Sequence, residues 1–280
     1  MTNSTLHHER LTRLTRHGRQ AEARSRELGM TEWRDDLSHL SPMRQAAWRR
    51  VLSSIATTEG LEESLMQPLM LAYKQPGEDH TEISEYLESH AVDERRHHAM
   101  LCGYLKQTFG YVKKSRTWSD RVIYDRVLPL MAQAFRYRPL YGFALLYTYE
   151  NFATEFYAPL RTQAQADGAQ NILSLLQAIE KDELRHVAGM EYLLDRELAR
   201  QGGLRRGDRA AIATLLNVLV LDVDFSPWAL HNREIRAHLC ELGVPPEGVT
   251  ATARRMRDHT LARLTASLAE KSEGVSHVVP

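Results

Sequence analysis

The sequence predicts an all-α protein organised as a helical bundle, and three observations support that prediction. Gly and Pro number only 15 and 10 among 280 residues, so few positions interrupt regular structure. The stretches between them are rich in Leu, Ala, Glu, Arg and Gln, which favour helix. In the longest stretches, apolar residues recur every three or four positions, as they do on one face of a helix. Long antiparallel helices joined by short turns are typical of bundles.

The N-terminal segment is basic. Residues 6–28 contain few apolar residues and six arginines, which are Arg10, Arg13, Arg16, Arg19, Arg24 and Arg26. This pattern fits either a basic arm for a polyanion or a solvated helix or frayed tail. Interleaved glutamates weaken the positive field and favour the second interpretation. We therefore treat residues 1–40 as an N-terminal basic helix or arm outside the bundle.

Helix start and stop signals divide the rest of the chain. Ser41-Pro42 provides an N-cap followed by Pro in the first turn, and both Asp167-Gly168 and Gly202-Gly203 end helices. The predicted helices span 42–74, 79–110, a crossover helix at 119–136, 139–167, 170–201, and at the C-terminus 207–222, 227–242 and 247–270. The bundle then occupies 41–201, and the helices of 202–280 pack on it.

Composition excludes several classes of protein. Lys+Arg and Asp+Glu both total 36, and the pI near 7.3 argues against a nucleic-acid partner. The two cysteines, Cys102 and Cys240, are too few for a disulfide scaffold or a Cys-rich zinc or iron–sulfur site. No apolar stretch reaches the roughly 20 residues of a membrane span, and the N-terminus lacks the apolar core of a secretory signal. We therefore expect a cytoplasmic protein without a membrane partner.

Three predicted helices have an apolar stripe that turns polar only at its centre. The three stripes are Leu52, Ile55, Glu59, Glu62, Met66, Leu69, Tyr73; Ile83, Leu87, His90, Glu94, His97, Leu101, Tyr104; and Ile172, Leu176, Ile179, Glu183, His186, Met190, Leu193. A carboxylate on a buried face costs several kcal/mol unless it is paired or binds a metal ion. Each stripe therefore carries carboxylates that must be paired with another group or bind a metal ion if the stripe is buried.

Two of the stripes share one motif. Glu94 and His97 lie in the string Asp-Glu-Arg-Arg-His, and Glu183 and His186 lie in Asp-Glu-Leu-Arg-His. The Glu-x-x-His spacing places a carboxylate and an imidazole side by side on one helix face. A single Glu-x-x-His is weak evidence, but chance does not account for Asp-Glu-x-Arg-His at both positions.

An internal repeat helps to choose the remaining acidic residues. The segment that begins at Glu59 aligns without gaps on the segment that begins at Glu150, and both reach Pro-Leu nine residues later. In an antiparallel hairpin, residues equidistant from the turn lie at one level, so Glu59 can meet Glu94 and Glu150 can meet Glu183. Glu62 and Glu155 satisfy the same geometry and remain alternatives, although the repeat favours Glu59 and Glu150.

Four carboxylates and two imidazoles in a bundle core match the ligand set of a dinuclear iron or manganese carboxylate site. Oxygen and imidazole donors without thiolates suit these ions better than structural zinc. The alternative is a buried network in which glutamates pair with protonated histidines and arginines. That alternative does not require the same pentapeptide at symmetric positions, so the sequence favours the metal site.

At these residues the chain resembles the ferritin-like di-iron carboxylate superfamily, over roughly residues 42–200. It is more similar to the oxygen-activating members, such as monooxygenase hydroxylases, acyl-carrier-protein desaturases and arylamine N-oxygenases, than to ferritins. The resemblance implies a ferritin-like four-helix bundle with a crossover helix. It also implies two ligand sets bridged by Glu94 and Glu183, which are Glu59, Glu94 and His97 for one ion and Glu150, Glu183 and His186 for the other.

The resemblance further implies supporting residues around these ligands. In the monooxygenases, the Asp of the shared string holds a ligating imidazole, so we expect this role for Asp93 and Asp182. Arg96 and Arg185 either neutralise these aspartates or form surface ion pairs. His90, one turn before Glu94, is a possible additional ligand, although a lone His on an apolar face is usually a hydrogen-bonded core residue. Tyr157 is expected to face the cluster.

The implied function is that of a non-haem oxidoreductase with two Fe ions, or Mn or a mixed Mn/Fe pair, and O₂ as co-substrate. It requires an external electron donor, either a ferredoxin or a reductase. The small-molecule substrate is an aromatic amine, an acyl group or a natural product. Six apolar residues are candidates for a wall near the site, although most of them are expected to be bundle core instead: Leu65, Met66, Phe143, Leu146, Phe152 and Phe156. A homodimer is also expected. Two alternatives remain, namely a ferroxidase or iron-handling ferritin-like protein and a tRNA-modifying di-iron hydroxylase.

Overall fold

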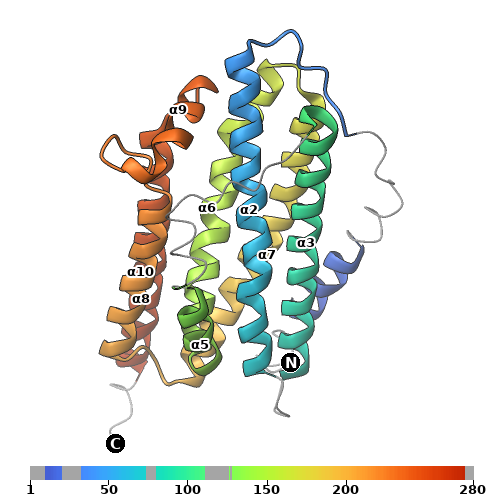
Figure 1. The fold of residues 1–280 in the computed structure, drawn as a ribbon. Coiled ribbons are helices and arrows are strands. Elements are labelled where there is room, and N and C mark those ends of the chain that lie inside the picture. Colours follow the sequence, from blue (N-terminus) through green and yellow to red (C-terminus); the bar gives the residue numbers. More distant parts are fainter. Residues whose placement is uncertain (1–9, 21–32, 74–79, 111–125, 127, 275–280) are drawn as a thin grey trace, which may run out of the picture.

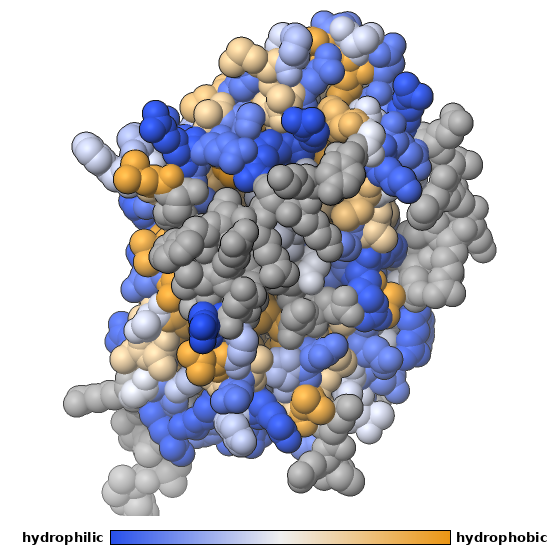
Figure 2. Space-filling model, viewed as in Figure 1, coloured by the Kyte–Doolittle hydropathy of each residue, from blue (hydrophilic) through white to orange (hydrophobic). Residues whose placement is uncertain are grey.

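The computed structural model of the chain describes residues 10–20, 33–73, 80–110, 126 and 128–274. Over these residues the regular structure is helical and contains no strand, which confirms the all-α prediction. Within the same residues, every helix is too short or too polar to cross a membrane. Polar and charged residues cover much of the face in Figure 2, with apolar residues interspersed.

Four long helices form the centre of the molecule (Figure 1), and they are α2 (Pro42–Ala72), α3 (His80–Phe109), α6 (Pro139–Ala166) and α7 (Gln170–Arg200). The helices α2 and α3 pack against each other along their lengths, and so do α6 and α7. The two hairpins meet where α3 contacts α7 and α2 contacts α6. The bounds of all four helices fall within three residues of the sequence prediction.

The helix ends show why these boundaries were readable from sequence. The Ser41 side chain accepts a hydrogen bond from the Arg44 N–H at the start of α2, and Pro42 occupies the first turn. After α6, Gly168 adopts a φ of +66°, and the Ala169 N–H donates to the carbonyl of Ala164. This is the left-handed end of a helix that glycine adopts without strain. The turn predicted at 75–77 lies outside the described residues.

Shorter elements surround the long helices, and they are α5 (Leu128–Tyr137), α8 (Arg206–Asp222), η2 (Leu230–Asn232), α9 (Arg233–Glu241) and α10 (Pro246–Gly274). The helix α5 covers α2 and α6, α9 covers α2, and α8 and α10 cover α6. The crossover helix predicted at 119–136 is described from residue 128 onward, apart from residue 126, and its earlier part lies outside the described residues.

One predicted helix begins later than expected. The helix predicted over 227–242 is α9, which begins at Arg233. The preceding loop has its own hydrogen bonds, because the Asn232 amide donates to the carbonyls of Asp222 and Asp224 and the Phe225 N–H donates to Thr250 Oγ1. Side-chain bonds to the backbone compete with helix formation, so the loop replaces the first turns of the predicted helix.

The core consists of two apolar clusters separated by a buried polar layer. Along α2, the first cluster ends at Ala56, Glu59 follows, and the second cluster begins at Leu65. The same change from apolar to polar and back occurs on α3, α6 and α7. The polar centres of the three stripes and the buried Glu150 of α6 therefore fall at one level of the bundle.

The described part of the N-terminal segment is a helix over residues 10–20, the short dark-blue helix beside α3 in Figure 1. Its inner face is buried through Leu11 and Thr15. Arg10 contacts Glu191 of α7, and Arg19 contacts Glu85 of α3. The segment therefore packs on the bundle with one face and presents the other to solvent. Arg24 and Arg26 lie outside the described residues.

Candidate metal centre

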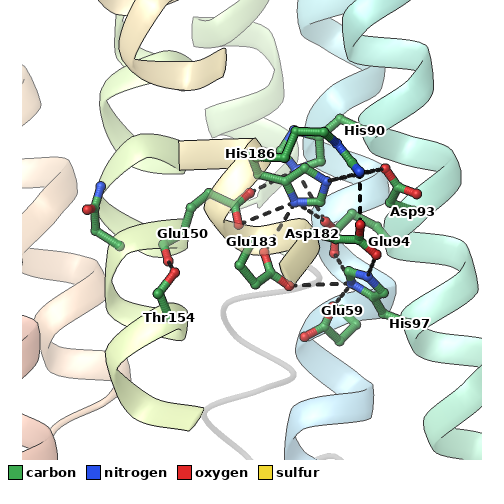
Figure 3. Close-up of polar contacts among 12 residues, drawn as sticks. Glu59, His90, Asp93, Glu94, His97, Glu150, Thr154, Asp182, Glu183 and His186 are labelled. Carbon is green, nitrogen blue, oxygen red and sulfur yellow. Dashed lines mark hydrogen bonds and ion pairs between the residues drawn. The ribbon is translucent and has the colours of Figure 1, made fainter. Parts of the chain in front are cut away.

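The polar layer between the two apolar clusters contains the six residues expected to bind metal. Each of the four long helices contributes, and every one of these residues is at most 3% exposed: Glu59, Glu94, His97, Glu150, Glu183 and His186. Figure 3 shows the labelled carboxylates and imidazoles pointing toward one another between the helices. The structure therefore brings together all six residues that the stripes and the repeat selected.

One ligand set consists of Glu59, Glu94, His97 and Glu183, whose donor atoms all lie within 4.8 Å of one another. His97 Nδ1 is 3.1 Å from a Glu59 oxygen, 3.4 Å from a Glu183 oxygen and 3.8 Å from a Glu94 oxygen. One imidazole nitrogen and three carboxylates thus surround one position. That is a suitable donor set for a single iron or manganese ion.

A second set consists of His90, Glu94, Glu150 and His186, again within 4.8 Å of one another. His186 Nδ1 is 3.1 Å from Glu94, 3.2 Å from Glu183 and 3.7 Å from Glu150. Glu94 belongs to both sets, and Glu183 lies within 3.4 Å of both His97 and His186. These two carboxylates therefore occupy the position of bridging ligands between the sets.

His90 belongs to the second set, although its position in the sequence indicated only a possible ligand. Its Nε2 is 2.8 Å from Glu150 and 3.2 Å from Glu94, and neither ring nitrogen makes a hydrogen bond of acceptable geometry. The ring stacks on His186 with 3.5 Å between centroids. Burial, and then the charge on His186, hold the His90 pKa well below 6.5. The imidazole is therefore neutral, which is the form that binds metal ions.

Each aspartate of the two shared motifs contacts the histidine of the other motif, which lies on the other hairpin. His97 Nε2 is 3.3 Å from Asp182, and His186 Nε2 is 3.4 Å from Asp93. Each aspartate therefore holds the imidazole of the other motif rather than that of its own. A proton on Nε2 that is donated to the aspartate leaves Nδ1 available, and Nδ1 is the atom that faces the glutamates.

Arg96 and Arg185 contact both aspartates. Arg96 lies 2.9 Å from Asp93 and also pairs with Asp182, and Arg185 lies 2.9 Å from Asp182 and also pairs with Asp93. The side chains of Arg96 and Arg185 are only 13% and 11% exposed, so these are not surface ion pairs. We call these four residues the Asp–Arg quartet. Its charges sum to zero.

The neighbours of Asp182 favour its ionised form. Burial alone raises the pKa of Asp182, but its hydrogen bond to His97 and the charges of His97, Arg185 and Arg96 lower the pKa from 3.8 to about 2. For His97, burial lowers the pKa, whereas hydrogen bonds from its imidazole to Asp182, Glu183 and Glu59 raise it well above 6.5. The carboxylates around His97 therefore favour its protonated form when no metal ion is present.

The charges of the centre do not cancel without a cation. The arginines are matched by the aspartates, so the four glutamates, when all are ionised, bring four negative charges that no arginine balances. Protonation of both His97 and His186 offsets only half of that charge, and His90 is held neutral. A buried ion-pair network among these residues is therefore incomplete. Two divalent cations neutralise the four glutamates, so the residues present fit a pair of metal ions.

Tyr157 lies beside the first ligand set, as expected. Its hydroxyl donates to Glu59 over 2.5 Å. Burial raises the pKa of this hydroxyl far above 10.0, and the charges of Glu59 and Glu183 raise it further. The phenol therefore keeps its proton at neutral pH, and that proton points at a ligand carboxylate.

Tyr157 also forms part of the wall of a small cavity of about 60 Å³. The apolar lining comes mostly from α2, α6 and the segment around α9, and includes Ile55, Phe152, Phe156, Val223, Phe225 and Ile235. Of the six candidate wall residues, Phe152 and Phe156 line this cavity. Leu65, Met66, Phe143 and Leu146 are bundle core, as expected for most of the six, and they pack in the second apolar cluster on the other side of the polar layer. The residues after 222 were missed because they are distant in sequence from every motif.

Of the two alternative ligands, Glu62 and Glu155, the structure describes the side chain of Glu155 alone. Glu155 lies on the exposed side of α6 and pairs with Arg255, whereas Glu150 is fully buried. The side chain of Glu62 lies outside the described residues. Glu155 is therefore available as a control residue on the same helix as Glu150.

Comparison with known proteins gives no match, whether to a family model, to a curated protein or to a solved structure. The interpretation of the centre therefore rests on its own geometry and charge.

Proposed function

We propose that the protein binds a pair of iron or manganese ions in this centre and uses them as an O₂-dependent oxidoreductase acting on a small apolar organic molecule. The bundle is then of the ferritin-like type that the sequence resembles. The single observation that carries the proposal is the pair of overlapping ligand sets joined by Glu94, buried between two apolar clusters. A structural ion-pair network does not require four glutamates in excess of its cations.

The donor atoms favour redox-active ions. The two sets together offer carboxylate oxygens and imidazole nitrogens, and neither includes a thiolate. Such donors suit iron and manganese, and two ions that share carboxylates can lie close enough to act on one small molecule. When bound, the ion pair supplies the electrons that reduce O₂, and this reduction is coupled to oxidation of the organic substrate.

The chain's own residues hold the ligands in position. Asp93 and Asp182 orient the two imidazoles, and Arg96 and Arg185 each pair with both aspartates. The glutamates are excluded from solvent by the apolar clusters on both sides. Water exclusion strengthens their interaction with cations, since the local dielectric constant is low.

The cavity beside Tyr157 lies next to the first ligand set, and at about 60 Å³ it must widen to admit an organic substrate, since ligand pockets are typically roughly 300–1,000 Å³. Phe152 and Phe156 stack with 5.6 Å between centroids and both line it. Its lining is mainly apolar, which favours an aromatic or acyl group over a charged one. Tyr157 holds a proton between this cavity and Glu59, where it can stabilise charge on that carboxylate.

Anaerobic loading with ferrous ions, followed by metal analysis and measurement of O₂ uptake, tests the proposal. We expect two irons per chain and O₂ uptake that stops when the loaded ferrous ions are oxidised and resumes with added reductant. The variant Glu150→Gln is expected to lose the second ion. Glu155→Gln changes an exposed carboxylate on the same helix and is expected to retain both ions.

Two results would contradict the proposal. Retention of hundreds of irons per assembly would show an iron-storage protein instead of an enzyme. Equal metal content in Glu150→Gln and the unchanged protein would show that the buried carboxylates serve the fold.

A further inference from the structure

The two halves of the internal repeat differ at three positions near the candidate metal centre. When the two Asp-Glu-x-Arg-His motifs are aligned, three pairs of equivalent positions carry different residues, and they are Tyr86 and Leu175, His90 and Ile179, and Gly189 and Met100. In the structure, Tyr86, His90 and Gly189 lie together beside the second ligand set. The three differences are therefore parts of one local arrangement.

Tyr86 contacts both histidines of the second set. It is 1% exposed and lies one turn before His90 on α3. Its ring meets the His90 ring edge-on, with 6.1 Å between centroids and 75° between the ring planes. Its hydroxyl donates to the backbone carbonyl of His186 over 3.3 Å. Tyr86 therefore connects the α3 histidine of the set with the α7 histidine.

The phenol end of Tyr86 occupies space that a side chain at position 189 would need. A Cβ atom at Gly189 would lie 2.0 Å from both Cζ and Oη of Tyr86, a separation that non-bonded atoms do not adopt. Glycine is unfavourable inside a helix, and Gly189 lies in the interior of α7, three residues after His186. Room for the Tyr86 phenol is therefore what this glycine provides.

His90 is positioned differently from the other two histidines of the centre. His97 and His186 each have an aspartate at the nitrogen that faces away from the glutamates. Among the described residues, neither ring nitrogen of His90 makes a hydrogen bond of acceptable geometry. Its orientation depends instead on two ring contacts, which are the stack on His186 shown in Figure 3, with 3.5 Å between centroids, and the edge contact with Tyr86.

We propose that Tyr86, seated in the space left by Gly189, is a positioning residue that holds His90 as a ligand of the second set. The proposal deepens the proposed function and rests on the metal binding that it includes. The aromatic ring restricts rotation of the His90 imidazole and keeps its Nε2 facing Glu150 and Glu94, at 2.8 Å and 3.2 Å. Tyr86 therefore acts on a bound ion through His90.

This arrangement makes the two metal positions unequal. At the equivalent positions of the other motif, Leu175 and Ile179 provide neither a ligand nor an aromatic ring. The first set accordingly contains one imidazole, that of His97, whereas the second contains those of His90 and His186. Imidazole and carboxylate donors differ in charge and in the ions that they prefer, so the extra imidazole is expected to set the affinity of the second position.

The test is a calorimetric titration of the full-length, metal-free protein with Mn²⁺, fitted to two sites. The variant His90→Ile identifies the second set as the site that it weakens. Tyr86→Leu introduces the residue of the equivalent position, Leu175, and removes the ring contact. Tyr86→Phe keeps the ring and removes the hydroxyl.

Two further variants separate positioning from packing. Tyr104 is another buried tyrosine of α3, packs in the first apolar cluster and corresponds to Leu193 in the repeat, so Tyr104→Leu makes the same chemical change away from the centre. The double variant Tyr86→Leu/Gly189→Ala refills part of the space that the phenol leaves but does not restore the ring contact. Circular dichroism shows which variants fold, and the double variant replaces Tyr86→Leu in every comparison if the single variant is unfolded.

We expect Tyr86→Leu to weaken Mn²⁺ binding at the second set by about three- to tenfold and to leave the first set unchanged. Tyr86→Phe is expected to bind within about twofold of the unchanged protein, because it keeps the ring. In the His90→Ile background, Tyr86→Leu is expected to cause no further loss, since the ligand that it positions is already absent. The double variant is expected to be more stable than Tyr86→Leu and to bind equally weakly. Tyr104→Leu is expected to bind as the unchanged protein does.

Unchanged second-set affinity in Tyr86→Leu, or equal losses at both sites, would overturn the proposal. So would the same loss in Tyr104→Leu, a further loss in the His90→Ile background, or a His90→Ile variant that weakens neither site. Recovery of affinity in the double variant would assign the effect to packing, and a loss in Tyr86→Phe as large as in Tyr86→Leu would assign it to the hydroxyl. Either result rejects the role of the ring contact with His90.

Failure of this proposal is separable from failure of the proposed function. Two bound ions and normal O₂ uptake in the unchanged protein, together with full second-set affinity in Tyr86→Leu, would reject the positioning role and leave the oxidoreductase proposal standing. If the unchanged protein bound neither Mn²⁺ nor ferrous ions, both proposals would be rejected.

Discussion

Two regions of the bundle bury carboxylates, and they do so in different ways. Glu197 on α7 is 2% exposed and accepts hydrogen bonds from Tyr73, Arg200 and Gln201. The central layer buries four glutamates, and its two arginines, Arg96 and Arg185, are already matched by aspartates. A buried acid with its own donors belongs to the fold, whereas a cluster with excess negative charge requires cations from outside.

The largest effect is expected from Glu94→Gln, which changes the carboxylate shared by both ligand sets. We expect loss of both metal ions. The same change removes one buried negative charge, so the metal-free variant is expected to be more stable than the unchanged metal-free protein by about 1–3 kcal/mol. Metal analysis and denaturant unfolding with and without metal measure the two effects. A variant that is destabilised in the metal-free state would show that Glu94 serves the fold.

The next largest effect is expected from Asp93→Asn, because Asp93 holds His186. Residues that orient a metal-binding imidazole typically change metal affinity by about 10–100-fold. We expect this loss at the second set only, whereas Asp182→Asn is expected to weaken the first set through His97. Calorimetric titration with Mn²⁺, fitted to two sites, distinguishes the two variants. Equal losses at both sets in both variants would show that the quartet acts only as a structural element.

Most of the candidate ligands and the four long helices could be predicted from the sequence. The two Asp-Glu-x-Arg-His strings gave Glu94, His97, Glu183 and His186, because i,i+3 spacing fixes their common helix face. The repeat added Glu59 and Glu150, since equivalent helices place equivalent residues at one level of the bundle. The four long helices were predicted from local start and stop signals, which depend on neighbouring residues alone.

Features that depend on contacts between distant segments were not predictable in the same way. The sequence does not reveal that Asp93 meets His186 rather than His97, because this crossing depends on how the two hairpins pack. The cavity wall from Val223, Phe225 and Ile235 has no local motif. The packing of helix 10–20 on the bundle could not be predicted, because its buried residues Leu11 and Thr15 form only a short stripe among arginines.

For the fold-supporting acid, Glu197→Gln is expected to destabilise the protein by about 1–3 kcal/mol, since buried donors lose a charged acceptor. Metal content is expected to be unchanged. Burial opposes ionisation of Glu197, but hydrogen bonds from Arg200 and Gln201 outweigh it and lower its pKa below 4.5. Its contribution is therefore fully present above pH 4.5 and is lost as the pH falls through the lowered value.

Unfolding measured between pH 7 and pH 3 on the metal-free protein checks this dependence. The unchanged protein should lose stability more steeply with acid than Glu197→Gln does, because the variant lacks this titrating group. If both lose stability with the same slope, the Glu197 interactions do not favour its ionised form.

The smallest effect is expected from His90→Ile, which introduces the residue that the internal repeat places at the equivalent position, Ile179. His90 faces Glu150 and Glu94 in the second ligand set. When His90 is removed, three donor residues remain there, which are Glu94, Glu150 and His186. We expect two ions still to bind, with affinity at the second set reduced by about tenfold. The reverse change, Ile179→His, adds an imidazole to the other motif and serves as a test of whether the asymmetry between the sets matters. If His90→Ile binds both ions with unchanged affinity, His90 is a core residue stacked on His186, and the two ligand sets are equivalent.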